Sequence, residues 1–274
     1  MKFNPTMPLI LTYCLVGTSN YLSAATSIQV SSIGRTELVG STASIPGGGT
    51  TANFSTAALV LGTSFARFQM VRADGSGTRV ADLRITPTAV KGTLNTVGAQ
   101  SGLMIAQTVN SQGLTDSGTF SILTNFSTAD GSGTSSITLR LDWLVPDTNT
   151  PFAISAEVTS FDYDFNQFLK VSNTEFSTDQ HGSALTRTNS GGFTTWQAGP
   201  SNSTFSNPNN AVIFNFLSDS STTIEVGKTG TGNSLFMFEF RDPSINLIPE
   251  PSISLLAIGG LGGLFLRRRR NHRN

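Results

Sequence analysis

The sequence predicts an all-β protein, and three of its features carry this prediction. Apolar and polar residues alternate over short segments, which is the pattern of strands that bury one face. Clusters of Gly, Asn, Asp and Ser separate these segments at short intervals. No long amphipathic helix is evident between residues 26 and 247. Short strands with frequent turns favour an antiparallel β-sandwich with a jelly-roll-like arrangement.

The alternation is clearest in four segments, and we expect a strand in each. The segments are residues 136–143, 161–165, 212–216 and 235–240. In the first, the residues expected on the buried face are Ile137, Leu139, Leu141 and Trp143. In the other three, the aromatic residues expected to share a face within their strand are Phe161, Tyr163, Phe165, Phe214, Phe216, Phe236, Phe238 and Phe240.

The composition allows one large folded body. Hydrophobic residues make up 38% of the 274-residue chain and 19 residues are Phe, so there is ample material for an apolar core. We place the body at residues 26–247, which is within the range of a single all-β domain. A division near residues 146–151 is the alternative. The one cysteine, Cys14, precedes the body, which therefore has neither disulfides nor a cysteine-based metal site.

Charge is unevenly distributed along a chain whose formal net charge is zero. Residues 26–248 contain three lysines and eight arginines against 16 acidic residues. An acidic body without a basic stripe argues against nucleic acid as a partner. The compensating positive charge is concentrated in residues 267–274, which include five arginines.

Residues 1–25 have the organisation of a secretory signal peptide. Lys2 precedes an apolar stretch over residues 7–16, and small residues follow up to Ala24 and Ala25. A positive region, an apolar region and a small-residue cleavage site are expected in this order for export by the Sec machinery. We expect cleavage after Ala25 or Ala24. A disordered segment or a buried N-terminal strand is the alternative interpretation.

Residues 248–274 combine a proline-flanked glutamate, an apolar run and a basic cluster. Pro249, Glu250 and Pro251 are expected to be extended, because proline blocks helix and sheet hydrogen bonding. The apolar run, residues 253–266, rises only about 21 Å as a helix. The arginines that follow it, which are expected to stay on the cytoplasmic side, favour it as a short membrane span. Its anchoring residues are Leu255, Leu256, Ile258, Leu261, Leu264 and Phe265, and the basic stop is Arg267, Arg268, Arg269 and Arg270.

This tail resembles the PEP-CTERM sorting signal of Gram-negative bacteria over its last 26 residues. The resemblance implies that an exosortase, a membrane-embedded protease or transpeptidase, recognises Pro249, Glu250 and Pro251. It also implies a transient inner-membrane anchor, followed by release to the cell surface or extracellular matrix. An ordinary C-terminal membrane anchor is the alternative interpretation.

A six-residue repeat occurs inside the body. Residues 73–78 read Ala-Asp-Gly-Ser-Gly-Thr and recur as residues 129–134. Asp-Gly followed by a second Gly is typical of a hairpin turn with positive φ, so we expect two similar β-hairpins. The alternative is that these loops supply oxygen ligands to Ca²⁺.

The remaining candidate site residues are few. Asp162 and Asp164 are expected on one face of a strand, where they would form a solvated acidic face or, alternatively, hold a metal or act as an acid/base pair. Trp196 is a candidate for stacking on sugar rings. His181 stands alone in a polar stretch without a nucleophile motif, and we expect it in a loop.

These observations favour a non-enzymatic surface or matrix protein without a cofactor. A carbohydrate-binding module that associates with exopolysaccharide is the first alternative. A glycan-active hydrolase that uses Asp162, Asp164 or Glu157 is the second.

Overall fold

The computed structural model describes residues 28–40, 51–54, 56–72, 76–95, 102–107, 119–154, 157–161, 163–201, 208–217 and 220–239. Within these ranges the chain forms sixteen strands and one short 3-10 turn, η1 (Pro208–Asn210). Among the same residues no helix is both long and apolar enough to span a membrane. The all-β prediction is therefore confirmed for the described body.

The strands form two antiparallel sheets. The first sheet contains, in spatial order, β1 (Ile28–Val39), β3 (Phe65–Arg72), β4 (Arg79–Lys91), β8 (Thr134–Leu144), β15 (Ser221–Thr229), β10 (Gln167–Ser172), β13 (Phe193–Ala198) and β12 (Leu185–Ser190). The second contains β11 (Phe176–His181), β14 (Val212–Phe216), β9 (Glu157–Phe161), β16 (Gly232–Glu239), β7 (Thr119–Thr128), β6 (Leu103–Gln107) and β2 (Thr51–Phe54), with β5 (Thr93–Leu94) paired to β7.

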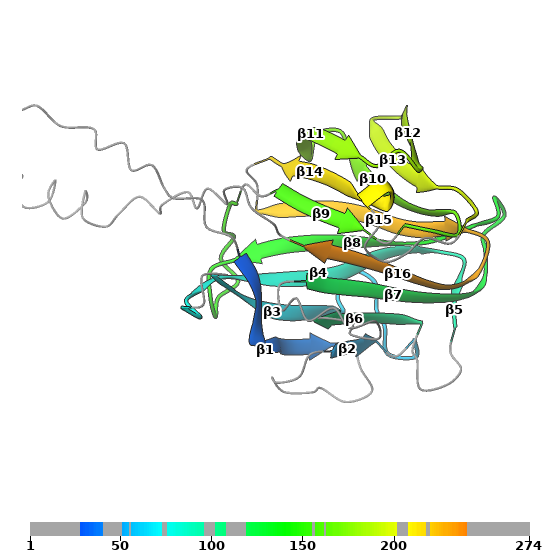
Figure 1. Cartoon of the computed structure of the whole chain (residues 1–274). Coiled ribbons are helices and arrows are strands. Elements are labelled where there is room, and N and C mark those ends of the chain that lie inside the picture. The colour runs from blue at the N-terminus through cyan, green and yellow to red at the C-terminus, as the bar shows by residue number, and fades with distance from the viewer. Residues whose placement is uncertain are drawn as a thin grey trace, which may run out of the picture.

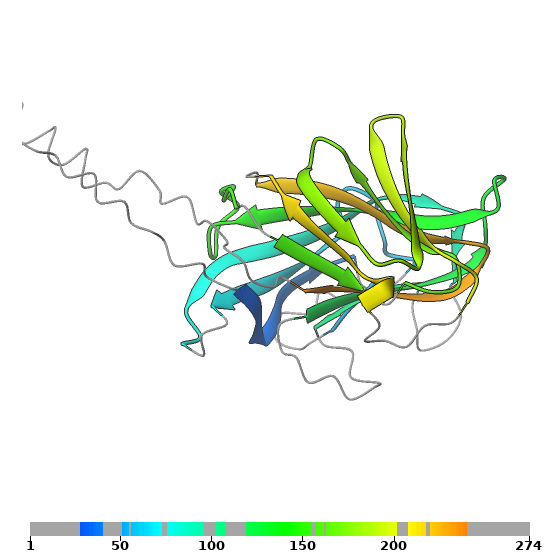
Figure 2. The same cartoon turned by 45° about the horizontal axis from the view of Figure 1, so that its top comes forward.

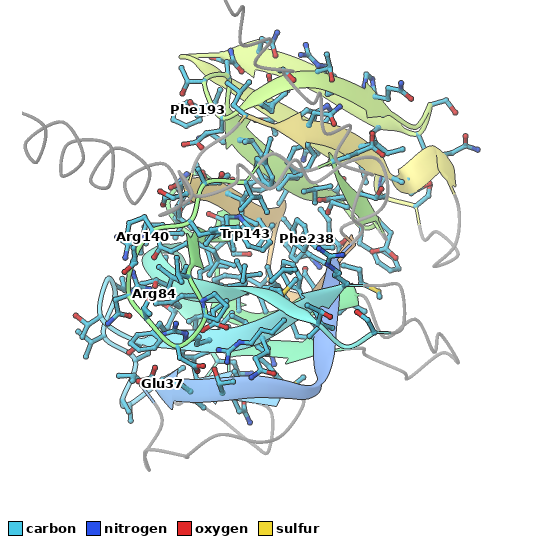
Figure 3. All side chains as sticks on the ribbon, turned by 90° about the vertical axis from the view of Figure 1, so that its left-hand side faces the viewer. Glu37, Arg84, Arg140, Trp143, Phe193 and Phe238 are labelled. Carbon is cyan, nitrogen blue, oxygen red and sulfur yellow. The ribbon has the colours of Figure 1, made fainter. Side chains whose placement is uncertain are left out.

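The two sheets stack as the layers of a sandwich (Figures 1 and 2). Figure 3 views the layers from one side, with Trp143 and Phe238 between them and Arg84 and Arg140 on the outside of the first sheet. Side chains of alternate residues point to opposite faces of a strand, so each strand contributes one face to the layer between the sheets. With sixteen described strands, the sandwich is larger than an eight-stranded jelly roll.

The buried faces follow the predicted alternation in three of the four segments. In β8, the residues expected to be buried are at most 2% exposed, and β14 and β16 bury their aromatic faces in the same way. The confirmed core positions are Ile137, Leu139, Leu141, Trp143, Phe214, Phe216, Phe236 and Phe238. Phe240 lies outside the described residues. The fourth segment, residues 161–165, departs from the prediction.

The two copies of the six-residue repeat occupy different places in the topology. The first copy connects β3 to β4, which pair as a hairpin. The second connects β7 of one sheet to β8 of the other, so the expected second hairpin is wrong. The second glycine of each copy nevertheless has a similar backbone conformation, since Gly77 and Gly133 adopt positive φ angles of 66° and 76°. Turn chemistry sets the local bend, but the partner of the following strand is set by packing.

Each sheet combines strands from both sides of residues 146–151. In the first sheet, β8 pairs with β15 over nine residue pairs. In the second sheet, β16 pairs with β7 from the earlier part of the chain and with β9 from the later part. One connected cluster of buried residues fills the space between the sheets. The described strands therefore share one core across this segment.

Candidate functional site

The segment after β9 forms a turn where the sequence predicts a continued strand. β9 ends at Phe161, and Asp162 lies outside the described residues. Phe165 and Asn166 adopt positive φ angles of 44° and 61°, which interrupt the alternation of faces. Tyr163 is consequently fully buried, whereas Phe165 is 47% exposed. The expected strand with a shared aromatic face over residues 161–165 is therefore wrong beyond Phe161.

The first half of this turn is anchored in the core through Tyr163. Its hydroxyl lies 2.6 Å from Ser160 Oγ, and its ring centroid lies 6.0 Å from that of Phe236. Burial raises the pKa of the Tyr163 hydroxyl, and the hydrogen bond with Ser160 opposes this only partly. The side-chain amide of Asn210 donates to the backbone carbonyl of Tyr163, and the Tyr163 amide donates to the Asn210 carbonyl at 3.3 Å.

The second half of the turn is anchored to the first sheet. The Asn166 amide donates to the Gly199 carbonyl at 2.9 Å, and the Thr229 amide donates to the Asn166 carbonyl at 3.2 Å. The Gln167 amide donates to the Asp164 carbonyl at 2.7 Å, which closes the turn. The crossing from the second sheet to the first is thus fixed on both sides, with Phe165 between the anchors.

A pocket of about 300 Å³ lies beside this turn, against the second sheet. Its lining residues are Met104, Leu123, Thr124, Asn125, Asp164, Phe165, Gln167, Asn233, Ser234 and Leu235. The volume is at the small end of ligand pockets, which span roughly 300–1,000 Å³. Because the turn and four strands, β6, β7, β10 and β16, contribute to the lining, the sequence does not reveal the pocket as one motif.

Strand register arranges the pocket side chains in two rows on the outer face of the second sheet. Leu123 pairs with Met104 on β6 and with Leu235 on β16, which makes an apolar row across three strands. Asn125 pairs with Asn233 and makes an adjacent amide row. Residues two apart share a face, and the neighbours of these side chains in β7 and β16 are buried between the sheets.

Two hydroxyl groups on the inner face of the same strands, behind the pocket, lack hydrogen-bond partners within the described chain. Thr124 and Ser234 are directly opposite each other in register and are 2% and 4% exposed. Their Oγ1 and Oγ atoms are buried without a partner. Buried polar atoms are almost always satisfied, so two neighbouring exceptions distinguish this part of the sheet.

The sugar-stacking role predicted for Trp196 is excluded by its burial. The side chain is 0% exposed, and its ring centroid lies 5.5 Å from that of Phe176 and 5.9 Å from that of Phe214. Alternation along β13 places Trp196 on the buried face with Thr194. A ring packed between the two sheets offers no face to a ligand.

Trp196 instead forms part of a polar contact between the sheets. Its indole Nε1 donates to Asp179 Oδ2 at 3.0 Å, and Arg187 donates to both oxygens of Asp179 at 2.9 and 3.0 Å. Burial raises the pKa of Asp179, but the donors Arg187 and Trp196 and the positive charge of Arg187 outweigh this, so the net pKa is lowered. His181 ends β11 and does not lie in the predicted loop; its Nδ1 is 3.7 Å from Asp179. The Asp179 carboxylate thus has a structural role, because it links the two sheets.

Charged side chains on the outer face of the first sheet also pair with one another. Glu225 accepts hydrogen bonds from Lys91 at 2.7 Å and from Lys170 at 3.2 Å. Asp142 accepts one from Arg84 at 3.0 Å. The pairs Lys170–Glu225 and Arg84–Asp142 join neighbouring strands, whereas Lys91 on β4 reaches Glu225 on β15 across β8. Such a ladder of opposite charges stabilises a sheet.

The described residues contain no cluster of three or more His, Cys, Asp or Glu that would hold a metal ion. In the second repeat copy, Asp130 accepts hydrogen bonds from the Ser132 hydroxyl at 2.5 Å and from the Thr134 amide at 3.0 Å. The hydrogen bonds from Ser132 and Thr134 lower the pKa of Asp130. This carboxylate therefore closes its own turn, as Asp does in many loops.

The residues predicted to direct export and sorting all lie outside the described residues. They are Ala24, Ala25, Pro249, Glu250, Pro251, Leu255, Leu256, Ile258, Leu261, Leu264, Phe265, Arg267, Arg268, Arg269 and Arg270. Of the two predicted carboxylates, Asp164 lines the pocket and Asp162 is not described.

The fold and the pocket define an antiparallel two-sheet β protein with a small mixed polar and apolar cavity. No protein-family model matches the chain, and no curated protein does. Among solved structures, the N-terminal domain of the Streptococcus gordonii adhesin Sgo0707 is similar at 16% identity and a TM-score of 0.46. The match covers 81% of this chain and 60% of that one. A likeness at this level carries no argument about function.

Proposed function

We propose that the chain is an exported, non-enzymatic protein of the cell surface or extracellular matrix. In this proposal a signal peptide over residues 1–25 directs Sec export. The PEP-CTERM-like tail, residues 248–274, then holds the chain in the inner membrane until an exosortase processes it. The main support for this proposal is the order in the sequence of Pro249–Pro251, the apolar run 253–266 and Arg267–Arg270.

The character of the body supports a role in binding or structure. The carboxylates of Asp142, Asp179 and Glu225 have cationic partners within the fold. The nearest approach to a catalytic pair is His181 with Asp179, and the latter is engaged by Arg187 and Trp196. Ser183, two residues after His181, donates its hydroxyl to Asn209 Oδ1 at 3.2 Å and so is not engaged with His181 as a nucleophile with its base.

The sorting proposal is tested with the variant Glu250→Ala in a Gram-negative host that makes an exosortase. We expect the released wild-type protein to lack Arg267–Arg270, and the variant to stay in the membrane fraction with them attached. Mass spectrometry of both termini measures the difference. Asp242→Ala is the matched control, since Asp242 also precedes a proline but lies before the motif. Intact wild-type chain in the inner membrane would contradict the proposal.

A further inference from the structure

We propose that the pocket beside the β9–β10 turn binds a neutral sugar unit of a polysaccharide, with Phe165 as its aromatic platform. This inference goes beyond the proposed function, which concerns where the protein is delivered. It rests on the pocket's side chains, the backbone of Phe165 and the charge at the site.

The two rows of side chains match the two kinds of surface on a pyranose ring. The apolar row of Met104, Leu123 and Leu235 suits the C–H face of the ring. The adjacent amides of Asn125 and Asn233 each offer both a donor and an acceptor, as sugar hydroxyls require. A few polar groups at the border of an apolar surface fix a small ligand's orientation.

Phe165 is held in a backbone conformation that is unfavourable for a bulky side chain. Its side chain is 47% exposed, and its φ angle of 44° is a conformation that bulky residues rarely adopt. Anchors on both sides of the turn hold it there, through Tyr163 in the core and Asn166 on the first sheet. Backbone strain held in place by its surroundings is concentrated at ligand-binding sites. An exposed aromatic ring at a pocket rim provides a stacking surface.

The charges beside the pocket are of both signs. Asp164 is the one charged residue in the described lining, and Lys228 lies close by, with its Nζ donating to the Asn233 carbonyl at 3.4 Å. A carboxylate and an ammonium group together leave no net positive charge to attract uronates or sulfated sugars, whereas the amides of Asn125 and Asn233 can bond neutral hydroxyls. The inference is therefore to neutral polysaccharides.

Phe193 provides a matched control for Phe165. It is 42% exposed, which is close to the exposure of Phe165, but it lies on the outer face of the first sheet (Figure 3). There, Lys170 Nζ lies 4.6 Å from the centre of its ring, and Phe193 does not line the pocket. Replacing either residue removes an exposed phenyl ring from the surface.

The test is affinity electrophoresis of the purified full-length chain in gels that contain dextran, galactomannan or xylan, with alginate as the anionic comparison. We expect retention by at least one neutral polysaccharide and none by alginate. Phe165→Ala should weaken that retention by at least about tenfold, whereas Phe193→Ala should change it by less than about twofold. Phe165→Gly should weaken it equally while relieving the strained φ, and its melting temperature reports whether the fold is kept.

Three results would overturn the proposal: no retention by any neutral polysaccharide, retention by alginate alone, or equal effects of Phe165→Ala and Phe193→Ala. A loss of binding in Phe165→Ala that Phe165→Gly restores would also overturn it, because the ring would then not be the contact. The binding assay uses purified protein, so its result does not depend on the outcome of the sorting experiment. The sorting experiment likewise does not depend on whether the pocket binds a polysaccharide.

Discussion

At Glu225, a buried carboxylate receives donors from three other strands. Lys91 and Ser136 donate to Oε1 at 2.7 Å each, and Lys170 donates to Oε2 at 3.2 Å. Burial raises the pKa of Glu225, but the hydrogen bonds from Lys91 and Ser136 and the charge of Lys170 outweigh it, so the folded pKa lies below the ordinary 4.5. The stabilisation is therefore present above pH 4.5 and is lost as the pH falls through the folded pKa.

We expect Glu225→Gln to lower the free energy of unfolding by about 1–3 kcal/mol near neutral pH. The difference from the wild type should shrink as the pH falls from 4.5 through the folded pKa, because below the folded pKa the wild-type carboxylate is protonated in both states. Urea unfolding at several pH values measures both quantities. Glu37→Gln, which removes an exposed carboxylate (Figure 3), should change the free energy by less than about 0.5 kcal/mol. A difference that stays constant with pH would contradict this account.

Residue-scale prediction from sequence succeeded where alternation alone decides burial and failed where a turn intervenes. The Thr and Gln residues beside Trp196 in the sequence do not indicate whether its side chain is buried. Its burial depends on Phe176 and Phe214 from the opposite sheet. The exposure of Phe165 depends on two successive positive φ angles at non-glycine residues. Asn adopts positive φ more readily than most residues, but no residue-type preference predicts it for Phe165, where the surrounding structure imposes it.

Among the elements, β15 lies at the centre of the first sheet and depends on a glycine. Gly227 pairs with Ser136 on β8 and with Phe168 on β10. A Cβ at this position would lie 2.4 Å from the Ser135 carbonyl oxygen and 2.8 Å from the Phe168 ring. The ring of Phe168 thus occupies the space that a side chain at position 227 would need, which is a close approach that only glycine allows.

We expect Gly227→Ala to destabilise the protein by about 1–3 kcal/mol or more, because the backbone of β8 cannot move away without breaking the ladder. Thermal unfolding followed by circular dichroism measures the loss. Gly131→Ala is the matched control, since a Cβ there meets no atom within 4 Å. Similar melting temperatures for the two variants would show that β15 tolerates the added methyl group.

At the scale of the whole molecule, the sheet order interleaves early and late parts of the chain. β8 and β15 are neighbours in the first sheet, and β7 and β16 are neighbours in the second. The two tryptophans, Trp143 on β8 and Trp196 on β13, lie on opposite sides of residues 146–151 and both contribute to the one core cluster. Unfolding of the strands before residue 146 should therefore expose the core residues of the strands after residue 151, and the reverse should hold as well.

We expect the single-tryptophan variants Trp143→Phe and Trp196→Phe each to unfold in one transition. In each variant, the fluorescence of the remaining tryptophan should change at the same urea concentration as the far-ultraviolet circular dichroism, since coincident probes indicate one cooperative unit. Comparing probes within a variant removes the effect of the substitution on stability. Separate midpoints would favour the division near residues 146–151.

Local alternation of apolar and polar residues was enough to predict the all-β class and the buried faces of β8, β14 and β16, because side-chain direction has a period of two in any strand. The export and sorting signals, too, are properties of contiguous residues and remain predictions from sequence. Strand partners, the crossing of the second repeat copy between sheets, the burial of Trp196 and the pocket beside Phe165 depend on residues far apart in the chain. Such features arise from packing between the sheets, which no local pattern encodes.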